Sequence, residues 1–217
     1  MPDYKARRTM MVDTQVRPSD VTKFPIIDAL LTVPREAYLP KALREAAYIG
    51  ENISLGGGRV LLEPRTLAKM LDGLDIQPTD LILDVGCTYG YSAAVLAQLA
   101  DAVVAVEQNE DMATIAQETL SANDVDNAAV VDAPLSKGAA KHGPYDVIVV
   151  QGAVQEIPQL LTDQLKEGGR MAAIFMEDAL GVVRLGYKID GAMNWRFAFN
   201  ASAPILPGFE RAQEFAL

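Results

Sequence analysis

The sequence predicts an α/β fold whose mostly parallel, seven-stranded sheet ends in an antiparallel hairpin. From residue 63 onward, short apolar segments alternate with amphipathic ones, which is the pattern of right-handed βαβ units in a sheet covered on both faces. Near the end, the rhythm changes to two strand-like segments around Asp190-Gly191, a dipeptide typical of a tight hairpin. The length of 217 residues suits one domain, since domains commonly have roughly 100–200 residues.

The first part of the chain is less regular than the rest. We expect residues 1–62 to form a helical cover with a substrate loop, over a core of residues 63–217 in the same domain. Pro34 and Pro40 interrupt the helical pattern, because proline cannot donate to a helix and biases the preceding residue toward extended geometry. Two helices are predicted before these breaks, over Ala6–Val16 and Phe24–Leu31.

In the core, a helix is predicted after three of the first five strands, and the last two strands form the hairpin. Apolar segments predict strands over Leu81–Val85, Ala102–Val106, Ala128–Val131, Asp146–Val150, Met171–Phe175, Val182–Ile189 and Met193–Asn200. Helical spacing predicts helices from Pro64 to Leu74 and over Ala93–Leu99, Met112–Ala122 and Pro158–Leu165. A turn is expected at Glu167-Gly168-Gly169.

Composition excludes several classes of function. The net charge of −10 provides no basic field for a phosphate backbone, so we expect no nucleic-acid partner. Cys87 and His142 are the only residues of their types, which excludes a cysteine or histidine metal cluster, and we expect no metal. The sequence has no apolar stretch of the ~18–20 residues that span a bilayer, and no signal segment of ~7–15 apolar residues near its start. We therefore expect a cytoplasmic protein without a membrane partner.

The strongest local signal is the segment Asp84–Tyr91, which lies where the first core strand turns into a helix. Gly86 and Gly90 let the backbone approach a ligand closely. Glu107 ends the next strand, about 20 residues after the glycine turn. A carboxylate at this spacing typically binds the hydroxyls of a ribose. Each feature has a purely structural reading, in which the glycines end a strand and Glu107 is a solvated acid. On matched strand ends, together they indicate a nucleoside-containing cofactor.

The spacing of the glycines favours one cofactor over another. A dinucleotide loop has a third glycine that cradles a pyrophosphate, whereas this chain has Thr88 at the central position. S-adenosylmethionine (AdoMet) has no phosphate and carries positive charge, so an acid such as Asp84 suits it as a neighbour. We therefore expect AdoMet, with S-adenosylhomocysteine (AdoHcy) as its product, and the elements match the Rossmann-like fold of AdoMet-dependent methyltransferases. The thiol of Cys87 is interpreted as packing and not as a nucleophile.

Several segments resemble the protein-L-isoaspartate O-methyltransferase family, over residues from about 11 to 170. They are Val33–Pro40, Asp84–Ala97, Val104–Glu107, Pro144–Val150 with Glu156–Pro158, and Gln164–Arg170. The resemblance implies methyl transfer from AdoMet to the carboxylate of an L-isoaspartyl residue in a damaged peptide or protein, a repair reaction that leads through a succinimide. It also implies a set of cofactor contacts: Asp84, Gly86, Cys87, Thr88, Gly90, Tyr91, Glu107 and Asp132.

The sequence departs from the family at two places. The family's Thr-Ile-Ser-Gln-like segment is here Val60–Glu63, so its hydroxyls are lost and a carboxylate is added, which Arg59 or Arg65 is expected to pair. Ser54 and Arg59 are the nearest polar candidates for the catalytic side of the site, in a glycine-rich loop over Leu55–Leu62. After the third strand the family's Gly-Asp-Gly is replaced by Val131–Leu135, which leaves Asp132 near its place but one residue out of register.

These departures leave three alternatives open. The apolar segment Val60–Leu62 is able to line a pocket for a small-molecule acceptor. The chain is also compatible with a non-catalytic AdoMet-binding protein, and less so with a nicotinamide enzyme. The sequence leaves the methyl acceptor and the oligomeric state undetermined.

Overall fold

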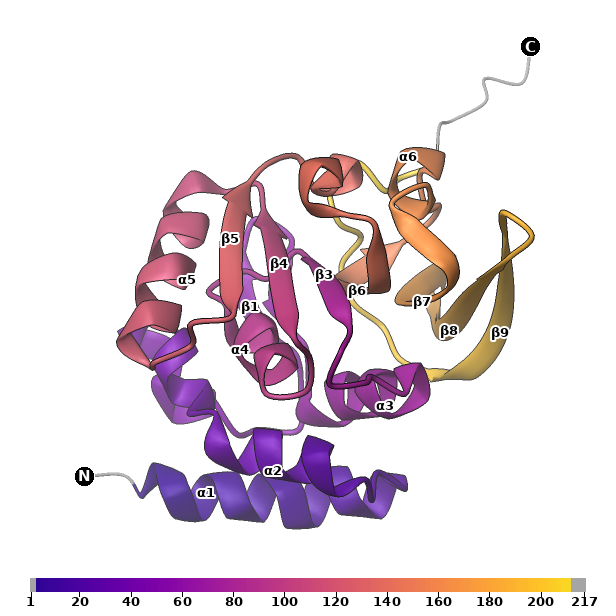
Figure 1. Cartoon of the computed structure of the whole chain (residues 1–217). Coiled ribbons are helices and arrows are strands. Elements are labelled where there is room, and N and C mark those ends of the chain that lie inside the picture. The colour runs from indigo at the N-terminus through magenta and orange to yellow at the C-terminus, as the bar shows by residue number, and fades with distance from the viewer. Residues whose placement is uncertain (1–2, 212–217) are drawn as a thin grey trace.

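The computed structural model describes residues 3–211. Its N-terminal part is helical, as predicted, and the helices α1 and α2 lie together at one end of the molecule, beside α3 (Figure 1). Helix α1 spans Tyr4–Met11, begins where the Asp3 carboxylate accepts from the Ala6 N–H, and continues through a π-helical turn over Val12–Val16. Helix α2 spans Phe24–Thr32. None of the helices within residues 3–211 has the length and apolar character needed to cross a bilayer.

The predicted seven-stranded sheet is confirmed, with the strand order β5-β4-β3-β6-β7-β8-β9. The pairs from β5 to β7 are parallel, whereas β8 pairs antiparallel with both β7 and β9. The strands are β3 (Leu81–Val85), β4 (Ala102–Glu107), β5 (Ala128–Asp132), β6 (Tyr145–Val154), β7 (Leu165–Glu177), β8 (Leu180–Ile189) and β9 (Ala192–Asn200). Helix α3 (Pro64–Leu74) precedes β3, and the helices between the strands are α4 (Tyr91–Ala97), α5 (Glu110–Ala122) and α6 (Gln159–Thr162). Asp190 and Gly191 both have positive φ in the β8–β9 turn, as the hairpin signal predicts.

Three predicted elements differ from the structure. Helix α6 is a single turn, four residues long, where a longer helix was expected. The expected turn at Glu167–Gly169 lies within β7, where the register with β6 shifts and Gly168 takes a positive φ. The expected loop at Leu55–Leu62 contains a short antiparallel hairpin, formed by β1 (Ile53–Gly56) and β2 (Arg59–Leu61) as a separate two-stranded sheet.

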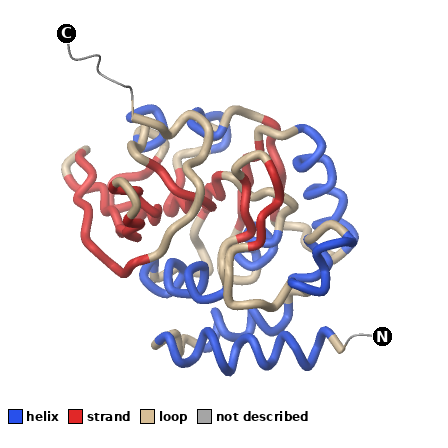
Figure 2. The backbone as a smooth tube through the Cα atoms, turned by 180° about the vertical axis from the view of Figure 1, so that it is seen from behind, coloured by secondary structure: helices blue, strands red, loops and turns tan. Residues whose placement is uncertain are grey.

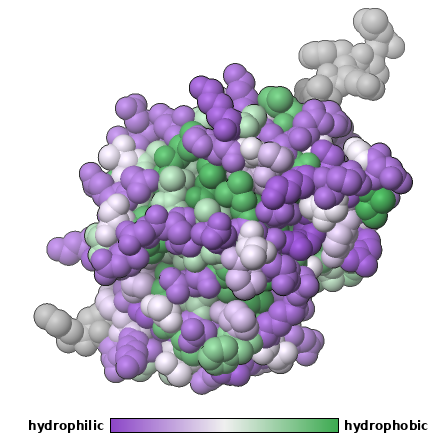
Figure 3. All heavy atoms as spheres, viewed as in Figure 1, coloured by the Kyte–Doolittle hydropathy of each residue, from purple (hydrophilic) through white to green (hydrophobic). Residues whose placement is uncertain are grey.

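Two hydrophobic cores lie on the two faces of the sheet. Alternate strand residues such as Ile82 and Leu83 belong to different cores because side chains along a strand point to opposite faces. The larger core includes residues of α1 to α5, whereas the smaller one is covered by α6, short 3₁₀ turns and the C-terminal segment. In the view of Figure 3, hydrophilic side chains cover most of the surface and hydrophobic ones gather near its middle.

The segment after β9 returns across the sheet as a long loop (Figure 2). It runs beside the end of β6, where the Ala153 N–H donates to the Pro204 carbonyl at 2.9 Å and the Leu206 N–H donates to the Ala153 carbonyl at 2.8 Å. Leu206 is 1% exposed. The C-terminal segment therefore covers the carboxyl end of the central strands, which is where ligands bind in open α/β sheets.

Candidate functional site

The turn between β3 and α4 has the tight backbone that its glycines predict. Gly86, Thr88 and Gly90 have φ values of +87°, +53° and +94°. The Gly86 N–H donates to the Val106 carbonyl at 2.8 Å, which ties the turn to β4. A non-glycine residue at positive φ is uncommon, so Thr88 is held in this conformation by its surroundings. The turn brings the end of β3 directly against the end of β4.

Glu107 lies at the centre of this arrangement and is fully buried. Its Oε1 accepts from the N–H groups of Gln108 and Asn109, at 2.9 and 3.1 Å. Its Oε2 accepts from the Thr88 N–H at 2.9 Å and from Arg59 Nη2 at 2.6 Å. Four donors therefore surround the carboxylate that the sequence assigns to the ribose.

Arg59 extends from β2 into the space over the glycine turn. It is 4% exposed, and a Cβ atom added at Gly86 would lie 3.0 Å from Arg59 Nη2. The Nε and Nη1 atoms of Arg59 are buried and have no hydrogen-bond partner within residues 3–211. Arg59 was predicted near the methyl acceptor, and the structure pairs it with Glu107, the acid predicted to bind the ribose.

Asp84 forms a second buried polar group beside the turn. Its Oδ2 accepts from the Ser92 hydroxyl at 2.5 Å and its Oδ1 accepts from Gln151 Nε2 at 2.8 Å. Burial raises the pKa of Asp84 to about 7, although both hydrogen bonds oppose the shift. Sequence reasoning missed Ser92 and Gln151, and no local pattern indicates them, because both reach Asp84 from other elements.

Asp132 lies beside Glu107 at the same edge of the sheet. The two residues are direct partners in the parallel pairing of β4 and β5, and Asp132 is exposed. The structure pairs Asp132 with Glu107 although the family's glycines are absent, and its register relative to the family's motif stays a prediction. The two carboxylates of Glu107 and Asp132 therefore lie at the same edge of the sheet.

Three other predicted site residues lie in different surroundings. The ring of Tyr91 is wholly buried, with the Arg35 guanidinium carbon 4.8 Å from its centroid and the Tyr38 ring at 6.0 Å. Cys87 is buried in the turn, where loss of hydration raises the pKa of its thiol well above the usual value, which fits the packing interpretation. Ser54 is exposed on β1, where it pairs with Val60, and does not join Arg59 at Glu107.

The divergent segment Val60–Glu63 begins with three apolar residues. Val60, Leu61 and Leu62 are all buried in the larger hydrophobic core, and the hypothesis that they line an acceptor pocket stays a prediction. Glu63 accepts from the Thr66 hydroxyl at 2.6 Å and pairs with Arg65 at 3.4 Å. The added carboxylate is thus paired by Arg65, one of the two arginines predicted for it.

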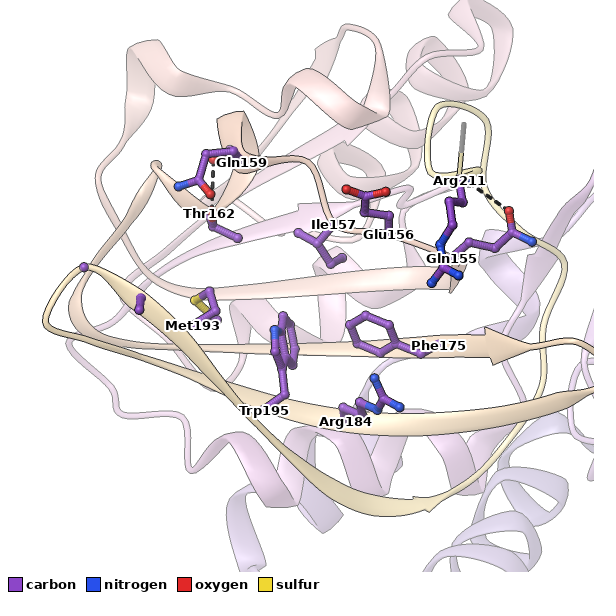
Figure 4. A pocket seen from close by; sticks show the side chains of 12 residues that line it. Gln155, Glu156, Ile157, Gln159, Thr162, Phe175, Arg184, Met193, Trp195 and Arg211 are labelled. Atoms are coloured by element: carbon purple, nitrogen blue, oxygen red, sulfur yellow. Dashed lines mark hydrogen bonds between the residues drawn. The ribbon is translucent and has the colours of Figure 1, made fainter. Parts of the chain in front are cut away.

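A cavity of about 520 Å³ lies farther along the sheet, over β7 to β9. Figure 4 shows Phe175, Trp195 and Arg184 on the strands and Glu156 on the segment after β6, with Arg211 near it. The rings of Phe175 and Trp195 are 4.9 Å apart in an edge-to-face arrangement, and Arg184 lies over Phe175 while it pairs with Glu177. This cavity is separate from the glycine turn and was not predicted from the sequence.

The residues at the glycine turn fit an AdoMet-type nucleoside in their chemistry. A buried carboxylate at the end of β4, an exposed one beside it and a glycine turn of positive φ are the groups such a ligand requires. The space over the turn is filled by the chain itself, because a Cβ at Gly86 would meet Leu206 Cδ1 at 3.5 Å as well as Arg59. The two carboxylates and the glycine turn fit the cofactor, and in this structure Arg59 and Leu206 fill the space over the turn.

Comparison with known proteins gives the same picture. The family model described as protein-L-isoaspartate(D-aspartate) O-methyltransferase matches residues 7–190. A protein-L-isoaspartate O-methyltransferase from Methanoculleus marisnigri is 37% identical over 169 residues, which cover 78% of this chain and 77% of the relative.

Two solved structures share the fold. One protein-L-isoaspartate O-methyltransferase superposes with a TM-score of 0.81 at 23% identity, over 94% of this chain and 66% of its own. Another, from Plasmodium falciparum in complex with S-adenosyl-L-homocysteine, has a TM-score of 0.79 at 19% identity over 95% and 99%. The predicted methyltransferase fold is confirmed, and the chain belongs to the protein-L-isoaspartate(D-aspartate) O-methyltransferase family.

Proposed function

We propose that the chain is an AdoMet-dependent methyltransferase that methylates the free carboxylate of an L-isoaspartyl residue in a peptide or protein. The observation that carries this proposal is the buried carboxylate of Glu107, placed between the glycine turn and Asp132 in a chain of this family. The relative solved with S-adenosyl-L-homocysteine supports the choice of cofactor. We further propose that the chain is cytoplasmic and that residues 1–217 form one domain. Its expected partner is a damaged peptide or protein.

The reaction requires little from side chains beyond positioning. Bound AdoMet supplies an electrophilic methyl group, and an isoaspartyl carboxylate is already ionised at neutral pH, so no general base is needed. Glu107 and the turn at Gly86–Gly90 bind and orient the nucleoside, and Asp132 contacts it from β5. Asp84 fixes the base of the turn through Ser92 and Gln151. The C-terminal segment with Leu206 excludes water from the carboxyl edge of the sheet.

The test is methyl transfer from labelled AdoMet to an isoaspartyl peptide and to its normal aspartyl twin, with cofactor binding measured in the same preparation. The proposal predicts label on the isoaspartyl peptide alone. Cofactor binding with no label on either peptide would reject the isoaspartyl acceptor. A panel of small carboxylic acids would then separate a different acceptor from a non-catalytic role.

A further inference from the structure

We propose that Arg59 is a latch on the cofactor site, whose guanidinium must leave Glu107 before the cofactor's ribose can bind there. This inference rests on the proposed function and adds a means by which the chain controls access to its own site. The latch consists of Arg59 and the hairpin tip, residues 54–59. In the latched state, the chain's own cation holds the acid that the cofactor needs.

Four donors surround the Glu107 carboxylate. Three of the four are backbone N–H groups, from Thr88, Gln108 and Asn109, and they are fixed by the turn and by the start of α5. Only Arg59 reaches the carboxylate with a side chain from a separate element. A hydroxyl group of a ligand can therefore take up this acceptor only in place of Arg59.

The guanidinium of Arg59 makes only part of its possible hydrogen bonds in the latched state. Arg59 Nη2 is paired, but Nε and Nη1 are buried without an acceptor within residues 3–211. Buried donors that lose water and gain no partner cost free energy, and that cost is recovered when the side chain moves into solvent. The latched state is therefore held by one strong contact and opposed by two unmade ones, which allows a ligand to displace it.

Open space surrounds the three glycines at the hairpin tip. Gly56, Gly57 and Gly58 all have positive φ, and a Cβ atom built on any of them meets no other atom within 4 Å. The strands β1 and β2 pair with each other in a sheet of their own. The base of the hairpin is fixed by Asn52, which donates to the Ser202 carbonyl and accepts from the Glu63 N–H, both at 2.8 Å. The latch therefore places the opening at the tip that carries Arg59, and the base stays fixed.

Arg59 also supplies positive charge beside the buried acids of the turn. Asp84 and Glu107 are both buried at the turn, and Arg59 is the cation paired with Glu107 there. AdoMet carries a sulfonium and an ammonium group, so its entry replaces one cation with another. Removal of Arg59 without a ligand leaves Glu107 with its backbone donors only. A nucleoside whose ribose hydroxyls donate to Glu107 is therefore the class of ligand that replaces Arg59, and the positive charge of AdoMet compensates for the displaced guanidinium.

The test compares AdoMet binding by the whole chain and two variants, using calorimetry. Arg59→Met keeps much of the apolar stem and removes the charge, and Arg65→Ala removes a nearby arginine that pairs with Glu63 instead of Glu107. The latch predicts that Arg59→Met binds AdoMet at least about tenfold more tightly than the unchanged chain, which is the effect of one charged hydrogen bond. Arg65→Ala is expected to bind within about twofold of the unchanged chain.

The outcomes separate the latch from the function on which it rests. Equal or weaker binding by Arg59→Met, with binding by the unchanged chain, overturns the latch alone. If neither chain binds AdoMet, the latch and the proposed function both fail. Hydrogen exchange of the unchanged chain needs no substitution: AdoHcy is expected to speed exchange of the amides at residues 54–59 and slow it at 86–90. Slower exchange at 54–59 would show that the hairpin closes on the cofactor, which contradicts the latch.

Discussion

Ser92, in the first turn of α4, donates its hydroxyl to Oδ2 of Asp84 at an O–O distance of 2.5 Å. This bond joins the acid near the end of β3 to the helix that follows the glycine turn. Gln151 on β6 donates to the other oxygen of the same carboxylate. Both contacts lie in a fully buried environment. Asp84 thus connects three elements beneath the cofactor loop, and its protonation state affects the stability of the whole site.

The free energy of unfolding is predicted to fall as the pH rises from about 4 to about 7, because of Asp84. Its pKa is about 3.9 in the unfolded chain, and burial raises it to about 7 in the folded chain. In this window the folded chain retains a proton that the unfolded chain has lost. The free energy of unfolding therefore decreases by up to roughly 1.4 kcal/mol per pH unit, and the effect is complete above the folded pKa. Urea unfolding of the unchanged chain and Asp84→Asn across this window measures it. Parallel pH profiles for the two proteins would contradict the role given to Asp84.

Loss of the Glu107 charge is predicted to weaken cofactor binding. Glu107→Gln keeps the size of the side chain. In the unchanged chain the donors bind two carboxylate oxygens, whereas the variant has one amide oxygen to accept from them. AdoHcy affinity is expected to fall by about tenfold or more, the effect of about 1.5–3 kcal/mol for a charged hydrogen bond. Glu110→Gln, an exposed acid in the first turn of α5, is the matched control. Unchanged affinity in Glu107→Gln would remove the ribose assignment.

A methyl group at Gly181 is predicted to displace the C-terminal segment. A Cβ atom at this position would lie 2.0 Å from the Ala201 carbonyl oxygen, which is backbone and cannot rotate away. Gly181→Ala is expected to lower the free energy of unfolding by about 1–3 kcal/mol or more, as overpacking does. Gly50→Ala meets only ordinary contacts at 3.6 Å from Gln15 and serves as the control. Thermal or urea unfolding measures the stability of both variants. Equal stability would show that the C-terminal segment moves away from the added methyl group without cost.

Cys87 is predicted to resist thiol reagents in the folded protein. The side chain is 1% exposed, and burial raises the pKa of its thiol well above the usual value, so thiolate is scarce and inaccessible. A disulfide reagent at neutral pH is expected to label the native chain slowly and the urea-unfolded chain at once. Similar rates in both states would mean that the glycine turn opens readily without ligand.

The parts of the site that the sequence predicts are those set by strand ends. Glu107 and Asp132 lie at the ends of consecutive parallel strands, and the sheet brings such ends together whatever the intervening sequence. The glycine turn follows for the same reason, since its conformation is local. Gln151 and Leu206 were beyond prediction because each reaches the turn from a distant element, and their positions depend on the full packing.

Arg59 shows the limit of assigning a residue from its neighbourhood in the sequence. Its position in a glycine-rich loop near Glu63 indicated a contact with the methyl acceptor or with that carboxylate. The loop instead forms the β1–β2 hairpin, which directs Arg59 toward Glu107, 48 positions away in the chain. The helix predicted at α6 is longer than the observed one for a related reason. Its apolar residues belong to a single turn that packs on the smaller core.

The most direct test of the account is a double-mutant cycle of Arg59→Met and Glu107→Gln, read as AdoHcy affinity. If Arg59 and the cofactor compete for one carboxylate, Arg59→Met increases affinity by about tenfold when Glu107 is present and by less than about twofold when it is replaced. An equal gain in both backgrounds would show that Arg59 acts elsewhere and would contradict the competition at Glu107.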